Sequence, residues 1–193
     1  PQTAVTPFDD GFESVSESAW PVLKDRRLPF TVFLCPASLD SDEPMPVDTW
    51  GNLYCSRAPA SSYRPLTTRQ CQEMNDSGLC ELGAHTHTHE DFRGRPEELR
   101  QDLALCLEVL RTRFGRESPT FAFPYGSPRM GFNSADLAAA ASETGVRCGL
   151  STQSSLVEPG ADPFTWGRFN VFSWDDSATL DAKLHGWYSW TGD

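Results

Sequence analysis

The segment Phe30–Cys35, with the sequence FTVFLC, is a continuous run of β-branched, aromatic and aliphatic residues. An uninterrupted apolar run of this length is typical of a strand that is buried on both faces, as in a parallel sheet. Further strands are expected at Thr3–Phe8, Leu79–Ala84, Thr120–Phe123, Val146–Ser151 and Arg168–Phe172. Residues 36–66, rich in Pro, Ser and Asp, are expected to form a long surface excursion.

Helical patterns alternate with these strands. The clearest is Pro96–Phe114, where apolar residues recur at helical spacing and Pro96 suits the first turn. These apolar positions are Leu99, Leu103, Cys106, Leu107 and Leu110. Other helices are expected at Ser14–Arg26 (with Ser14 as a cap), Thr67–Ser77, Ser134–Thr144 and Ala178–Trp187.

This alternation predicts an α/β fold with a parallel sheet and crossover helices. An open doubly wound sheet and a closed barrel both give the pattern, and in both the loops at the carboxyl ends of the strands carry function. A chain of 193 residues suits a single domain, residues 1–193, with one sizeable core.

The charge balance disfavours several kinds of partner. The net charge is −11 and the pI is about 4.7, so nucleic acid and anionic membranes are repelled, whereas a neutral glycan is compatible. No apolar run approaches the roughly 18 residues of a membrane span. The oligomeric state stays open.

Six cysteines, at positions 35, 55, 71, 80, 106 and 148, contain no CxxC pair, and several lie in apolar runs. We interpret these as small buried hydrophobes, although a disulfide between Cys55 and Cys71 stays open. Unpaired thiols slightly favour the cytoplasm. The residues from Pro1 onward do not read as a signal peptide, but export stays open because the chain lacks an initiator methionine.

The first polar motif, Asp9-Asp10-Gly11, follows the first expected strand directly. Asp-Gly is a common turn pair, so a plain turn is one interpretation. The other is functional: alternation directs the two side chains differently, so that one carboxylate binds a metal while the other serves as a base.

The second motif places three histidines within five residues, at His85, His87 and His89. His85 and His89 are four apart, which brings their rings together if the chain turns helically after the strand. Neutral imidazoles suit zinc and similar divalent ions, and two histidines with one carboxylate leave open positions for water and substrate. A polar loop is the alternative interpretation, and His87 is expected to point away.

The third motif, residues 121–126 (FAFPYG), also lies at a strand end. A strand followed by a turn explains it without any function. Alternatively the segment forms a groove wall, in which an aromatic ring packs on a sugar and backbone N–H groups face a developing oxyanion.

Together these three blocks resemble the polysaccharide deacetylase (NodB-homology) family, a carbohydrate esterase family. The matching motifs are FDDG at residues 8–11, HTHTH at 85–89 and AFPYG at 122–126. The resemblance implies a distorted (β/α) barrel of about seven strands, and a hydrolase that removes N-acetyl, less often O-acetyl, groups from amino sugars of a glycan. It also implies a divalent metal, usually zinc, sometimes cobalt or nickel.

By matched position the resemblance assigns a role to each site residue. Asp9 would be the base, and Asp10, His85 and His89 the metal ligands. The backbone N–H of Tyr125 would help to bind the oxyanion. In the functional interpretation of the third motif, the substrate-binding segment would consist of Phe123, Pro124, Tyr125 and Gly126.

The sequence departs from the family pattern at three places. Pro7 replaces the usual Thr, and Ala122 replaces the Arg that normally contacts the base. Arg168 is a candidate to supply that guanidinium, with a surface arginine as the alternative. The family's late Leu-x-Leu-His motif has no clear match; His185 is a candidate acid, with a place in a terminal helix as the alternative.

Two rival functions remain at this point. A hydrolase of other non-peptide C–N bonds, such as small cyclic amides, fits the same fold. An inactive glycan-binding module would explain the missing Arg, but it gives no reason for keeping the carboxylates and histidines together.

Overall fold

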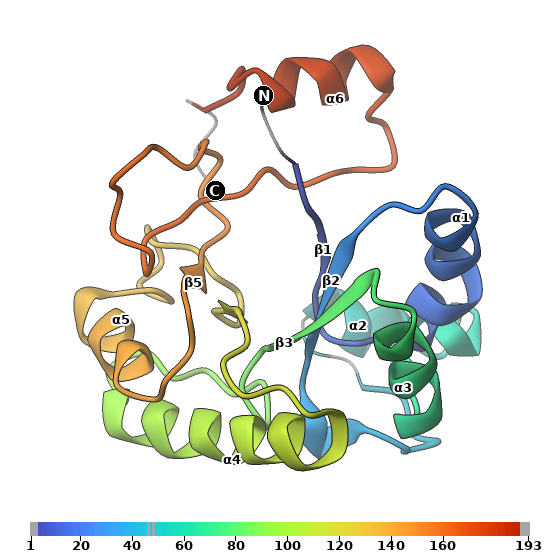
Figure 1. Cartoon of the computed structure of the whole chain (residues 1–193), viewed down its shortest axis with the longest axis horizontal. Helices are drawn as coiled ribbons and strands as arrows, with labels where there is room; N and C mark the ends of the chain where they lie inside the picture. The colour runs from blue at the N-terminus through green and yellow to red at the C-terminus, as the bar shows by residue number, and fades with distance from the viewer. Residues whose placement is uncertain (1–3, 46, 48, 190–193) are drawn as a thin grey trace. The chain divides into compact units, whose positions relative to one another are not determined.

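The protein is an α/β structure with parallel strands (Figure 1), described by a computed structural model over residues 4–45, 47 and 49–189. The chain divides into two compact units. The first unit comprises residues 1–90 and 102–119, and the second comprises residues 91–101 and 120–193. The expectation of one catalytic domain over residues 1–193 stays a prediction.

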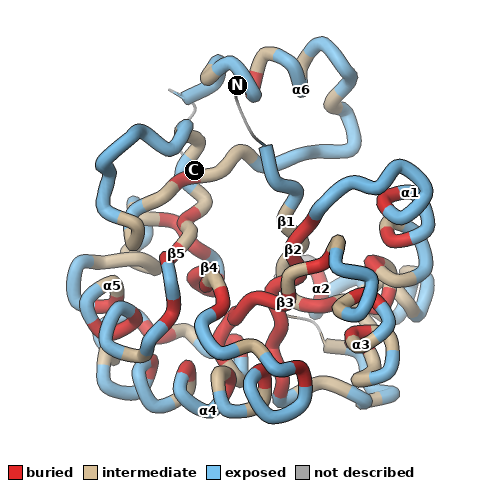
Figure 2. Tube along the Cα trace, viewed as in Figure 1, coloured by how far each residue is buried: buried red, intermediate tan, exposed pale blue. Residues whose placement is uncertain are grey.

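The first unit contains three parallel strands, β1 (Thr6–Phe8), β2 (Phe30–Leu34) and β3 (Cys80–Ala84). β2 pairs with both neighbours, in a register that sets Phe30 beside Thr6 and beside Cys80. All five residues of β2 are buried, as the apolar run predicted (Figure 2). β2 is therefore the central strand of this unit.

Helices connect the strands of the first unit. They are the π-helical turn Val15–Ala19 continuing into α1 (Trp20–Asp25), the short 3₁₀ turns Pro36–Ser38 and Ala60–Ser62, α2 (Thr49–Tyr54) and α3 (Thr68–Asp76). α3 contacts β3. Thr67 caps α3 in a capping box: its hydroxyl accepts from the Gln70 backbone, while the Gln70 side chain accepts from the Thr67 N–H.

Helix α4 (Pro96–Phe114) has the bounds that the sequence predicted. Four of its five predicted core positions are fully buried, and Leu107 is half-buried. The second unit contains the remaining short strands, β4 (Phe121–Ala122) and β5 (Gly149–Leu150), which pair in parallel. It also contains α5 (Ala135–Ser142) and α6 (Ser177–Leu184).

Two expectations about the fold are corrected. Ser14 does not cap its helix, because its backbone is already helical (φ −56°, ψ −26°) and its side chain makes no capping bond. Arg168–Phe172 is not a strand: the Lys183 ammonium bonds the carbonyl of Asn170, and the Asp175 carboxylate bonds the N–H of Phe172. These side-chain bonds replace a strand ladder. The described residues contain five strands, so the expected number of about seven stays a prediction, and Thr3 lies outside the described residues.

The six cysteines are free, so Cys55 and Cys71 form no disulfide. Within the part of the chain that the structure describes, no helix is both long enough and apolar enough to cross a bilayer.

Candidate active site

The Asp-Gly turn after β1 has a steric reason for its glycine. Asp10 and Gly11 both have left-handed backbones, with φ of 71° and 75°. A Cβ on Gly11 would lie 2.7 Å from the Cδ2 of Leu34, which is fully buried on β2. The turn therefore needs glycine both for its dihedral angles and for its close approach to β2. Asp9, next to it, is half-buried.

The same turn is held by a segment more than 50 residues away. The Leu66 N–H donates to the carbonyl of Gly11 at 2.8 Å. Arg64 Nη1 lies 2.9 Å from Glu13 Oε2, and the Glu13 N–H donates to the carbonyl of Arg64. Gln70 donates to the other oxygen of Glu13 at 3.3 Å. Sequence reasoning missed Glu13 and Arg64, because no local pattern connects them.

The histidine motif does not turn helically, which corrects the mechanism expected for bringing its rings together. After β3 the chain enters a turn in which Thr86 and His89 are left-handed, with φ of 65° and 60°. The His89 N–H donates to Thr86 Oγ1 at 3.1 Å, which fixes the turn internally. The His85 N–H donates to the carbonyl of Leu34 on β2 at 3.0 Å.

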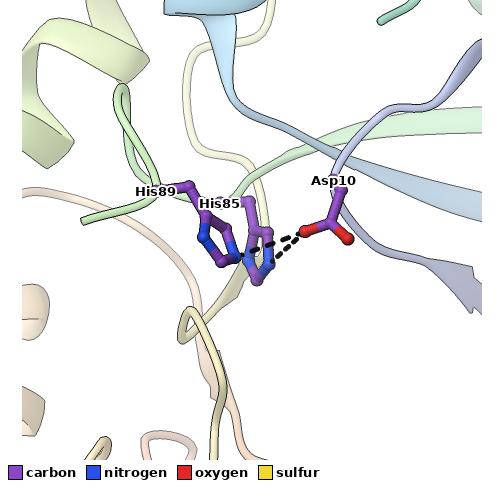
Figure 3. A group of neighbouring side chains, drawn as sticks. All are labelled: Asp10, His85 and His89. Carbon is purple, nitrogen blue, oxygen red and sulfur yellow. Dashed lines mark ion pairs between the residues drawn. The ribbon is translucent and has the colours of Figure 1, made fainter. Parts of the chain in front are cut away.

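These two turns bring Asp10, His85 and His89 together at the carboxyl ends of β1 and β3 (Figure 3). Asp10 Oδ1 lies 3.3 Å from the Nε2 of His85 and 3.3 Å from the Nε2 of His89. The three candidate ligand atoms lie within 4.8 Å of one another. The carboxylate and both rings thus point at one small region.

The separations fit a metal ion better than hydrogen bonds. A tetrahedral site with metal–ligand bonds of about 2.1 Å separates its ligand atoms by roughly 3.4 Å. A charge-assisted hydrogen bond between imidazolium and carboxylate would be shorter, about 2.7–2.9 Å. Two nitrogens and one carboxylate oxygen are also a donor set that zinc accepts. The residues present therefore fit a divalent ion.

Electrostatics keep the Asp10 carboxyl in the form that a metal requires. Burial on its own would raise the pKa of Asp10, but hydrogen bonding and coulombic interaction with the His85 and His89 rings hold this pKa well below its ordinary value. Both imidazoles are buried, with side chains 2% and 6% exposed. An ionised carboxylate flanked by two sheltered imidazoles is ready to bind a cation.

His87, the middle histidine, is not part of this cluster within the described residues. Its backbone N–H donates to Asp102 Oδ1 at 2.5 Å, and its carbonyl accepts from the Ala37 N–H at 3.0 Å. The sequence had suggested this separation of His87 from the other two histidines.

In the second unit, the motif at 122–126 forms a tight turn. Tyr125 and Gly126 are left-handed, with φ of 62° and 64°, and the Gly126 N–H donates to the carbonyl of Pro124. A Cβ on Gly126 would lie 3.0 Å from the backbone nitrogen of Thr152, which accounts for the glycine. Tyr125 is 38% exposed, whereas Pro124 is buried.

Phe123 has a different place from the one expected for a substrate-binding ring. Its ring is buried, packs edge-on against Phe121 with centroids 4.7 Å apart, and fills the space beside Gly149. It belongs to the core of the second unit. Ala122 is likewise buried, within β4.

The two other candidates also lie in the second unit. Arg168 is half-buried, and its Nε donates to the carbonyl of Ser151 at 3.2 Å. His185 ends α6 with its side chain 57% exposed, and its Nδ1 lies 2.8 Å from the carbonyl of Asp181. His185 is thus part of a terminal helix end, as the alternative interpretation had it.

Comparison with known proteins gives a consistent family. The family model described as polysaccharide deacetylase matches residues 1–149. A poly-β-1,6-N-acetyl-D-glucosamine N-deacetylase of Staphylococcus epidermidis is 25% identical over 188 residues, which covers 93% of this chain and 57% of the relative. Its counterpart in Staphylococcus aureus is 23% identical, covering 81% of this chain and 50% of the relative. The chain therefore spans about half the length of these relatives.

Solved structures agree with the fold. IcaB from Ammonifex degensii is similar with a TM-score of 0.74 and 25% identity, over 93% of this chain and 72% of that one. The deacetylase domain of BpsB from Bordetella bronchiseptica is similar with a TM-score of 0.63 and 20% identity, over 86% of this chain and 69% of that one.

Proposed function

We propose, since the chain belongs to the polysaccharide deacetylase family, that it is a metal-dependent hydrolase that removes N-acetyl groups from amino-sugar residues of a glycan. The observation that carries this proposal is the position of Asp10 Oδ1, 3.3 Å from the Nε2 of both His85 and His89. A buried carboxylate and two buried imidazoles in this arrangement match a three-ligand site with open positions. Zinc is the ion we propose.

Each step of amide hydrolysis has a candidate group in the chain. A divalent ion held by Asp10, His85 and His89 would polarise the acetyl carbonyl and make water more acidic. Asp9 would accept the proton of the attacking water as its oxygen bonds to the carbonyl carbon. The C–N bond then breaks, and the leaving nitrogen takes up a proton from the general acid, for which His185 is the candidate.

Two further roles rest on motif position. The backbone N–H of Tyr125 would donate to the oxyanion, and its left-handed backbone, beside a glycine that admits no Cβ, supports a fixed orientation. Arg168 would supply the guanidinium that Ala122 lacks. His185 remains the candidate acid, although the exposed side chain and its contact with its own helix give that role little support.

The relatives support a choice of substrate. Those from both staphylococcal species are named for deacetylation of poly-β-1,6-N-acetyl-D-glucosamine. We propose the same class of substrate here, an uncharged acetylated polymer that the acidic chain does not repel. For the complete fold we keep the distorted barrel of about seven strands as a proposal.

The test measures acetate released from β-1,6-linked N-acetylglucosamine oligomers, together with bound metal, for wild type and His85→Ala. His87→Ala is the matched control, because it removes a neighbouring ring outside the cluster. We expect about one divalent ion per chain and acetate release in wild type and His87→Ala, and loss of both in His85→Ala. Equal acetate release by wild type and His85→Ala would refute the proposal. Metal binding without acetate release would assign the site to another amide or ester.

A further inference from the structure

The turn that carries both histidine ligands is held from outside by one carboxylate. Asp102, on α4, accepts the His87 N–H at 2.5 Å and the Thr88 N–H at 3.3 Å on Oδ1. Its Oδ2 accepts from the Thr88 hydroxyl at 2.7 Å. Both oxygens are therefore used on the two residues that lie between Thr86 and His89.

The three hydrogen bonds to Asp102 stabilise a turn with unusual backbone dihedral angles. Thr86 and His89, on either side of the gripped residues, are left-handed, and a β-branched residue such as Thr86 is rarely found there. Residues in such conformations persist only where the surrounding structure imposes them. Two successive N–H groups converging on one carboxylate oxygen provide that restraint, in the manner of an anion bound in a backbone nest.

These hydrogen bonds to Asp102 also affect the orientation of the His85 and His89 rings. His85 is fixed by its N–H on β2 and His89 by Thr86 Oγ1, but both bonds depend on the path of the chain between them. The Ala37 N–H donates to the carbonyl of His87, whereas Asp102 accepts from the N–H of His87. The two bonds therefore fix the two sides of this residue's backbone. Without the carboxylate, the N–H groups of His87 and Thr88 lose their acceptor and the turn is free to relax toward unstrained dihedral angles.

We propose that Asp102 is a positioning residue of the metal site: it holds the 86–88 turn so that His85 and His89 present their Nε2 atoms to the ion with Asp10. This inference rests on the proposed metal site. Asp102 does not belong to the ligand cluster among the described residues, and it acts through the backbone of the turn. Nothing local in the sequence connects it to the motif, because it lies 15 residues beyond His87 on a helix.

The test compares zinc affinity, measured by competition with a chromophoric chelator, in wild type, Asp102→Asn and Glu98→Gln. Asn keeps the shape of the side chain but loses the charge and one acceptor. Glu98 is an exposed acid on the same helix, so its replacement controls for loss of charge. Outer residues that orient metal ligands typically contribute 10- to 100-fold to affinity. We expect that loss in Asp102→Asn and less than a twofold change in Glu98→Gln.

Two more measurements separate positioning from folding. The Co²⁺-loaded proteins at saturating metal should show a shifted visible spectrum in Asp102→Asn and an unchanged one in Glu98→Gln, since the spectrum follows ligand geometry. Thr88→Val, which removes only one donor, should weaken zinc binding about two- to fivefold.

The outcomes distinguish this inference from the proposed function. Asp102→Asn could bind zinc with an affinity within twofold of that of wild type and show the same Co²⁺ spectrum. This result would overturn the role of Asp102 and leave the proposed metal site unaffected. A wild type that binds no zinc would overturn both. An Asp102→Asn variant whose metal-free form has lost its helical circular dichroism would assign Asp102 to the fold instead.

Discussion

Replacing Gly11 with alanine should destabilise the metal-free protein far more than the same change at Gly78. Both glycines lie in the first unit with φ near 70°, and an alanine in that conformation costs about 1–2 kcal/mol, partly offset by a stiffer unfolded chain. At Gly78 no atom lies within 4 Å of the new Cβ, so the net cost should be about 1 kcal/mol.

At Gly11 a second cost is added. The new Cβ would lie 2.7 Å from Leu34 Cδ2, so the Leu34 side chain, which is fully buried on the central strand, must shift among its packed neighbours. Overpacking of this kind costs about 1–3 kcal/mol. The total for Gly11→Ala is therefore about 2–4 kcal/mol.

Thermal unfolding in EDTA, followed by far-UV circular dichroism, measures the difference. For a chain of this length, each kcal/mol lowers Tm by about 2–4 °C. We expect a fall of roughly 2–4 °C for Gly78→Ala and roughly 4–16 °C for Gly11→Ala. Equal falls for the two variants would refute the tight approach of the Asp-Gly turn to β2.

Three other predictions address the site and the thiols. Asp9→Asn should keep its bound metal, by elemental analysis, but lose about 10²–10⁴-fold in kcat because the proton acceptor is gone; undiminished kcat would contradict this. Zinc at 1,000 times its Kd should raise the stability of the metal-free protein by about 4 kcal/mol in a denaturant titration, and an equal rise in Asp10→Ala would argue against this ligand set. Of the six thiols, only Cys55 should react with a thiol reagent at pH 8, because the other five are buried. Burial raises the pKa of Cys71, for example, to about 12. Labelling of more than one thiol before denaturant is added would contradict the packing.

The sequence predicted those parts of the fold whose signals are local. The bounds of α4 follow from its helical periodicity and from a proline at its start, and the buried β2 follows from an apolar run. The meeting of Asp10 with His85 and His89 was also predictable, because the carboxyl ends of β1 and β3, which both pair in parallel with β2, lie at one edge.

The remainder depends on contacts between distant residues. The left-handed turn at Thr86 and His89 is imposed partly by Asp102, and the anchoring of the Asp-Gly turn depends on Glu13 and Arg64, 51 residues apart. Likewise the sequence left open whether Phe123 lies in a strand or at a groove wall, because a strand-end aromatic residue fits either place until its neighbours are known, and the structure buries its ring.

Zinc K-edge X-ray absorption on the zinc-loaded protein tests whether Asp10, His85 and His89 bind the ion, because it reports the atoms bound to zinc. We expect two imidazole nitrogens and further light-atom ligands at about 2.0–2.2 Å, and no bound zinc in His85→Ala. Sulfur at about 2.3 Å would show that cysteines hold the ion instead, and would contradict the assignment of Asp10, His85 and His89.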